Sequence, residues 1–200
     1  MNLYWRGLRF GMLLQFAIGP MCLMVFGAAR ESGLAAAFSL VSAIALVDAF
    51  YIFLAGAGVS RLLERERPRR VLKAVSAAVL VLFGLNMALG AFGHGFIPGL
   101  SLTASRSGLF VQGLVLTLSN PLTIVFWGGV LTAEMAEKNY SRRAFLIFSV
   151  GLVSATAFFL SGVALLGTVL SEFIPAGAAG ALNVIIGAAI AFFGLRGLLK

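Results

Sequence analysis

Asp48 is a carboxylic acid in the middle of an apolar run, and it is the residue of this chain best placed to do chemistry. Of the seven acidic residues, it alone lies deep in such a run. A carboxylate at the centre of a membrane helix costs about 3 kcal/mol on insertion scales, so it usually faces the protein interior and binds an ion or a ligand. Tyr51 shares its helix face, three residues on. The alternative is a structural acid held by hydrogen bonds.

Two prolines interrupt long apolar runs, in "FAIGP", which ends at Pro20, and in "LSNPL", which contains Pro121. Proline removes a backbone donor and frees carbonyls that lipid cannot satisfy, so such a break is stable only inside protein or beside water. Broken helices also expose half-helix ends whose dipoles hold charged substrates. We expect the two helices to bend near the bilayer midplane and to lie side by side around a central cavity. A plain kink that serves packing is the alternative.

The other polar residues of these runs are the remaining candidates. Gln15 and Gly19 are expected at positions i and i+4 on one face of the first helix, and Asn120, Thr123 and Trp127 along one face of the fourth. They could line a cavity with Asp48, although hydrogen bonding between helices explains Gln15 and Asn120 equally well. No catalytic residue, metal ligand or cofactor is expected. The candidate substrate- and ion-binding residues are Asp48, Gly19, Pro20, Asn120, Pro121, Gln15, Tyr51 and Thr123.

The elements that must position these residues are membrane-spanning helices. Hydrophobic residues make up 60% of the 200 positions and charged residues 11%, far from the averages of soluble proteins. Cleavage of the first run as a signal peptide is an alternative, but a leader would need neither Gln15 nor a Gly-Pro break. Six runs approach or exceed the roughly 20 residues that span a bilayer; they cover about 10–29, 35–59, 72–93, 109–133, 144–170 and 178–199.

The basic residues predict the orientation of these spans, because positive charge gathers on the cytoplasmic side. With six spans, only Arg30 and Arg106 fall on one side, and both termini fall on the other, cytoplasmic side. This distribution explains the net charge of +8 without a nucleic-acid partner. The cytoplasmic side carries Arg6, Arg9, Arg61, Arg65, Arg67, Arg69, Arg70, Lys73, Lys138, Arg142, Arg143, Arg196 and Lys200.

Short matches between the two halves of the chain indicate an internal repeat. "FGL" occurs at 83–85 and 193–195, "LVSA" at 40–43 and 152–155, and Pro20 corresponds to Pro121. Three spans in each half force the second half to insert upside down, as in many secondary transporters. The sequence therefore predicts an all-α integral membrane protein with one transmembrane domain over 1–200. It would be built from two inverted three-helix repeats, at about 1–95 and 105–200.

Three stretches resemble the lysine exporter family and its homoserine/threonine exporter relatives. They are "GMLLQFAIGPMCLMVFGAARESGLAAAF", "LVDAFYIFLAGAGVSRLL" and "LTLSNPLTIVFWGGVL". The resemblance extends over the whole chain and implies export of amino acids or similar small metabolites across the bacterial cytoplasmic (inner) membrane, driven by an ion gradient. Lysine and arginine exporters often have a polar residue after the proline, where this chain has Met21.

Other functions remain to be weighed against export. A divalent or heavy-metal cation exporter of the same fold is the alternative, although dedicated metal sites use several ligands. A thiol-disulfide carrier would need two cysteines, and Cys22 is the only one. A hydrolase would need an acid pair or a Ser/His arrangement, so no enzyme is expected. We expect a secondary antiporter, with proton coupling favoured over sodium. Its expected partners are a small-molecule substrate, the coupling ion, the lipid bilayer and, as an open alternative, a second copy in a homodimer.

Overall fold

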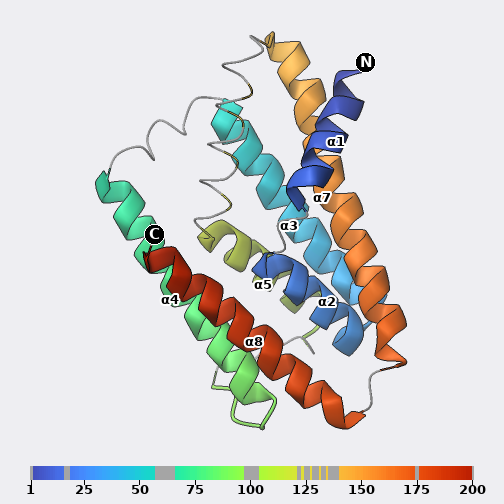
Figure 1. Ribbon diagram of the computed structural model, residues 1–200, viewed down its shortest axis with the longest axis vertical. Coiled ribbons are helices and arrows are strands. Elements are labelled where there is room, and N and C mark those ends of the chain that lie inside the picture. Colours follow the sequence, from blue (N-terminus) through green and yellow to red (C-terminus); the bar gives the residue numbers. More distant parts are fainter. Residues whose placement is uncertain are drawn as a thin grey trace.

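The computed structural model describes residues 2–15, 19–56, 66–96, 104–120, 123, 127, 131, 134, 140–173 and 176–199. Within these ranges the chain is all-α and forms seven helices (Figure 1). They are α1 (Leu3–Gln15), α2 (Pro20–Ser32), α3 (Leu34–Gly56), α4 (Glu66–Gly90), α5 (Arg106–Ser119), α7 (Arg142–Ser171) and α8 (Ala176–Leu199).

These helices correspond to the apolar runs of the sequence. The predicted break in the first run is confirmed, because α1 ends at Gln15, α2 begins at Pro20, and the two are bent by 85°. By length and composition, α3 and α7 can cross a membrane, and a third span results if α1 and α2 are counted together. Shorter apolar helices cover Ala77–Gly90 and Gly180–Arg196. The repeat in two halves stays a prediction.

Local sequence explains where several helices begin and end. Pro20 is the first residue of α2, where its missing N–H would have no helical partner. The hydroxyls of Ser105 and Ser141 accept hydrogen bonds from the first turns of α5 and α7. Gly33 ends α2 at a φ of 82°, a conformation that glycine adopts without strain. As a result α2 and α3 are separate helices although one residue divides them.

Glycines allow the helices to pack in close pairs. Gly7 and Gly11 place α1 directly against the backbone of α7, and Gly113 places α5 against α3. Gly84 of α4 and Gly187 of α8 face one another so closely that a Cβ on either would collide with the other's backbone. Such small-residue contacts are typical of membrane helices. Figure 1 shows the α4–α8 pair beside the group formed by the other helices.

The buried apolar residues form two clusters along the molecule. The first surrounds α2 and includes Ile44 of α3 and Leu160 of α7. The second lies toward the start of α7 and includes Val47 of α3 and Leu152 of α7. Each of these long helices therefore passes from one cluster to the other near its middle. Asp48 and Thr156 are buried at that crossing.

Candidate substrate-binding site

A chain of hydrogen bonds joins α1, α7 and α3 at the boundary between the two apolar clusters. The amide of Gln15 donates to the hydroxyl oxygen of Thr156, with Nε2 and Oγ1 2.6 Å apart. The same hydroxyl donates to the carboxylate of Asp48, with Oγ1 and Oδ2 2.9 Å apart. Thr156 is 1% exposed and Asp48 5% exposed, so both are shielded from solvent. Gln15 is half-buried, and the three side chains form one polar layer across α1, α7 and α3.

Trp127 completes the surroundings of Asp48 from a fourth part of the chain. Its side chain hydrogen-bonds the Asp48 carboxylate, and the indole of tryptophan can only donate. Trp127 is 2% exposed and belongs to the second apolar cluster. The carboxylate therefore accepts hydrogen bonds from both Thr156 and Trp127, which is the arrangement that a charged carboxylate favours. The acid predicted from the sequence is therefore buried between two hydrogen-bond donors, Thr156 and Trp127.

Tyr51 connects α3 to the end of α5. Its hydroxyl donates to the backbone carbonyl of Leu118, with the two oxygens 2.6 Å apart. The last carbonyls of a helix have no partner within it, so this bond satisfies one of them. Asn120 caps the same end, is 4% exposed and accepts a hydrogen bond from the N–H of Thr123 on its carbonyl. This places the end of α5 one helical turn from Asp48 along α3.

The two interrupted helices meet at their broken ends. Thr117, in the last turn of α5, donates to the sulfur of Met21, in the first turn of α2, with Oγ1 and Sδ 3.5 Å apart. The start of a helix carries partial positive charge and the end carries partial negative charge. Gly19, the residue before α2, has no side chain with which to cap the first N–H groups. A positive and a negative helix end therefore lie beside each other at the level of the breaks.

Two details of the sequence prediction are wrong. Gln15 and Gly19 do not lie on one face of a continuous helix, because α1 ends at Gln15 and Gly19 precedes a new helix. Likewise Asn120 is not on a helical face with Thr123 and Trp127, because its backbone is extended, with ψ at 106°. In both cases the helix ends before the proline and does not simply bend at it, so the candidate residues no longer share a helical face. Pro121 itself lies outside the described residues.

The structure brings some candidate residues together and adds others. Asp48 and Gln15 belong to one hydrogen-bonded chain, whereas Tyr51, Asn120 and Thr123 gather at the end of α5. Gly19 and Pro20 form the start of α2. Sequence reasoning missed Thr156, although it is one of few polar residues in its run. Across the described part of the chain, no group of three or more His, Cys, Asp or Glu could hold a metal ion.

Comparison with protein families finds one match that covers most of the chain. The family model described as LysE type translocator matches residues 12–200. The match begins within α1 and includes both helix breaks, Asp48 and Thr156. No curated protein and no solved structure matches the chain.

Proposed function

Because this chain belongs to the LysE type translocator family, a family of membrane transporters, we propose that it exports amino acids or similar small metabolites in exchange for protons. One observation carries the proposal. A buried polar layer around Asp48 lies between two apolar clusters and next to two broken helix ends. Transporters commonly bind substrate where discontinuous helices meet near the bilayer midplane. The apolar helices and the family together make this a multi-pass membrane protein.

The helix ends suit a zwitterionic substrate. The first turn of α2 has no side-chain cap, and the partial positive charge at this helix end attracts a carboxylate. The last turn of α5 presents carbonyls, and Asp48 supplies a full negative charge, so both attract an ammonium group. In this arrangement the α-carboxylate binds near Gly19 and Pro20, and the α-amino group binds toward Asp48 and Asn120. Gln15, Tyr51 and Thr123 position these groups.

Proton exchange at Asp48 provides the coupling. A low-dielectric site disfavours the charged form of a carboxyl group, so Asp48 is charged most readily when an ammonium group lies beside it. A proton that arrives from the outer side neutralises Asp48 and releases the ammonium group to that side. The protonated transporter then returns and releases the proton inward. Each cycle moves one substrate out against one proton in.

The directions of the packed helices support a six-span, inverted-repeat topology. Helices α1 and α7 run parallel, because Gly7 lies against Phe148 and Gln15 against Thr156. Helices α3 and α5 also run parallel, with Gly113 against Leu40 and the α5 end against Tyr51. Parallel pairing of the first span with the fifth, and of the second with the fourth, is what six alternating spans require. A two-fold axis in the membrane would exchange these two pairs.

The α4–α8 pair fits the same symmetry. Its helices are antiparallel, with Gly84 against Gly187 and Gly194 against Ala77. The two "FGL" stretches are 110 residues apart, and the same offset relates Gly84 to Gly194 and Ala77 to Gly187. The two contacts are therefore equivalent under the repeat. These contacts support one transmembrane domain of two halves, over about 1–95 and 105–200. Together with the basic residues, they support an inner-membrane protein with both termini in the cytoplasm.

Efflux from reconstituted vesicles tests the proposal. Proteoliposomes are preloaded with a panel of neutral, basic and acidic amino acids or, in a parallel preparation, with divalent cations. Efflux is measured with a pH gradient, with a sodium gradient and with neither. We expect one or more amino acids to leave faster under the pH gradient than from protein-free vesicles. Faster efflux under the sodium gradient alone would show that the coupling ion is sodium and not the proton. Efflux of divalent cations, but of no amino acid, would favour the metal exporter.

A further inference from the structure

The short helix α2 is bounded by two backbone joints. It begins after Gly19, where the chain bends by 85°, and it ends at Gly33, whose φ is 82°. Between these joints its 13 residues extend about 20 Å. Where it packs on α7, it faces Gly167, which offers no side chain to interlock with. Helix α2 is therefore a short segment with a joint at each end, and Met24, Val25 and Ala28 pack it into the first apolar cluster.

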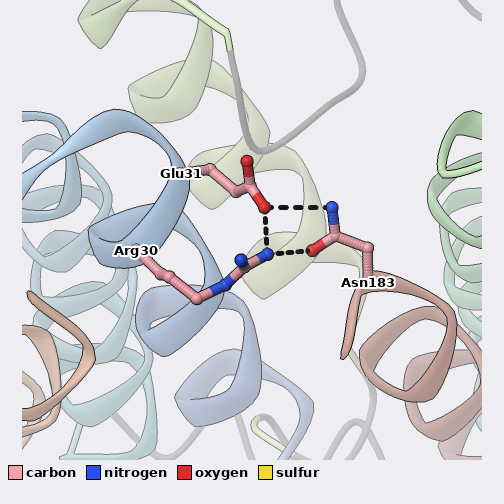
Figure 2. Close-up of polar contacts among 3 residues, drawn as sticks. All are labelled: Arg30, Glu31 and Asn183. Carbon is pink, nitrogen blue, oxygen red and sulfur yellow. Dashed lines mark hydrogen bonds and ion pairs between the residues drawn. The ribbon is translucent and has the colours of Figure 1, made fainter. Parts of the chain in front are cut away.

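A polar bridge fastens the far end of α2 to α8 (Figure 2). Arg30 forms an ion pair with Glu31 and donates to Asn183, with Nη2 and Oδ1 2.9 Å apart. Asn183 in turn donates to Glu31, with Nδ2 and Oε1 3.1 Å apart. The side chain of Arg30 is 6% exposed, so a charge is buried here between the end of α2 and α8. Separating these groups removes the compensation for a buried charge, so the bridge favours one closed position of α2.

A second polar bridge fastens the start of α1 at the opposite end of the molecule. Arg6 forms an ion pair with Glu134, with Nη2 and Oε1 2.6 Å apart. The hydroxyl of Tyr140 donates to the same oxygen at 2.9 Å, and the guanidinium of Arg6 lies 5.8 Å from the centre of the Tyr140 ring. This bridge joins α1 to the segment that leads into α7.

Helix α7 shows how the two bridges and the candidate site are arranged. Its residue Gly151 contacts α1 at Tyr4, Thr156 binds Gln15, and Gly167 contacts α2 at Phe26. Gly151 and Gly167 are separated by about 24 Å along the helix. The broken first helix therefore carries a polar bridge near each of its ends and the Asp48 layer between them.

We propose that the two bridges are the alternating gates of the transporter. Arg30, Glu31 and Asn183 close the path on the side where α2 ends, and Arg6, Glu134 and Tyr140 close it on the side where α1 begins. Opening one bridge exposes the Asp48 layer to that side while the other bridge stays closed. This inference rests on the proposed export function and adds the parts that move.

Crosslinking of the outer bridge tests the inference. Cys22→Ala removes the only native thiol, and Glu31→Cys with Asn183→Cys then places one thiol on each side of the bridge. A short bismaleimide joins the pair where a direct disulfide does not form. The matched control joins Ala91→Cys to Gly180→Cys, at the contact between the end of α4 and α8, where a Cβ on Gly180 fits without collision. Each single-cysteine variant receives the same reagent.

We expect the crosslink between positions 31 and 183 to reduce efflux to the rate of protein-free vesicles. The control crosslink should leave efflux unchanged, and each single-cysteine variant should show the same efflux with the reagent as without it. A second pair, Arg6→Cys with Glu134→Cys, should also block efflux when it is joined. Efflux that continues unchanged with the 31–183 crosslink in place would show that the bridge is a static tie, and it would overturn the gate while the export function stands.

A separate readout covers the case in which the parent protein exports nothing from the panel. In that case the export function fails, and the gate is judged from the labelling of Asn183→Cys by a membrane-impermeant maleimide added outside. Glu31→Gln breaks the ion pair at unchanged size, so faster labelling in that background supports an opening bridge. An unchanged labelling rate would reject it.

Discussion

The α4–α8 pair and the group formed by α1, α2, α3, α5 and α7 are held together by different means. Between α4 and α8 the contact is glycine against backbone, with Gly84 facing Gly187. The other group also packs through glycines, but it buries a hydrogen-bonded layer around Asp48 and contains both helix interruptions. We therefore assign the chemistry to the group of five helices and a supporting role to the pair.

Buried asparagine shows the same difference between the two regions. Asn86 of α4 is 3% exposed, and its side-chain oxygen accepts the backbone N–H of Phe96 at 2.8 Å. That bond secures the turn after α4. Asn120 instead caps the interrupted end of α5, beside the first turn of α2. A buried amide in the pair thus stabilises a turn, whereas one in the other group lies at the candidate site.

The largest effect is expected for Asp48→Asn. The amide keeps the size of the side chain and one acceptor oxygen but cannot take up a proton, so efflux driven by a pH gradient should be lost while the protein still inserts and folds. The matched change in the pair, Asn86→Leu, should leave efflux per folded molecule unchanged. Efflux from proteoliposomes measures both. Accumulation of substrate by Asp48→Asn as strong as in the parent would make Asp48 structural.

An intermediate effect is expected for Thr156→Val. The valine is nearly the same size, but it removes the donor to Asp48 and the acceptor of the Gln15 amide. Hydrogen bonds between membrane helices contribute about 1–2 kcal/mol, which corresponds to about a fivefold to thirtyfold change in rate. Thr156→Ser keeps the hydroxyl and should restore most of the initial rate. Equal rates for valine and serine would exclude a positioning role for the hydroxyl.

A smaller effect on transport, but a clear one on stability, is expected for Gly84→Leu. The added side chain collides with the backbone of Gly187, and overpacking of this kind costs about 1–3 kcal/mol. Thermal unfolding in detergent should occur at a lower temperature, while the folded fraction keeps its efflux rate. Gly180→Ala serves as the control, because its Cβ meets only ordinary contacts. If Gly84→Leu abolished efflux at an unchanged unfolding temperature, the pair would have to take part in the chemistry.

The helices and the main features of the site could be predicted because each follows from a strong local cause. Proline in the middle of an apolar run cannot continue the preceding helix but can begin a new one, as Pro20 does, and long apolar runs have few other stable forms in a membrane. Asp48 was identifiable because an acid within an apolar run is costly to insert into a membrane and usually has a functional role.

The partners of Asp48 depend on how helices distant in sequence pack, and the sequence does not display this. In the sequence, Thr156 cannot be distinguished from Thr168, another threonine of the same helix. The hydroxyl of Thr168 donates to the carbonyl of Ala164 in its own helix. The hydroxyl of Thr156 reaches Asp48 because α7 packs against α3 and α1 at that level. The relation assumed between Gln15 and Gly19 failed for a similar reason, since it required a continuous helix where the chain turns by 85°.

Proton movement during transport tests the central claim most directly. Proteoliposomes that contain substrate and an internal pH-sensitive dye are diluted into substrate-free buffer at equal pH, so that only outward substrate movement drives the cycle. The account predicts that the lumen of vesicles with parent protein becomes acidic as substrate leaves. Vesicles with Asp48→Asn should show no such change. Substrate efflux by the parent without acidification, or equal acidification with Asp48→Asn, would contradict proton exchange at Asp48.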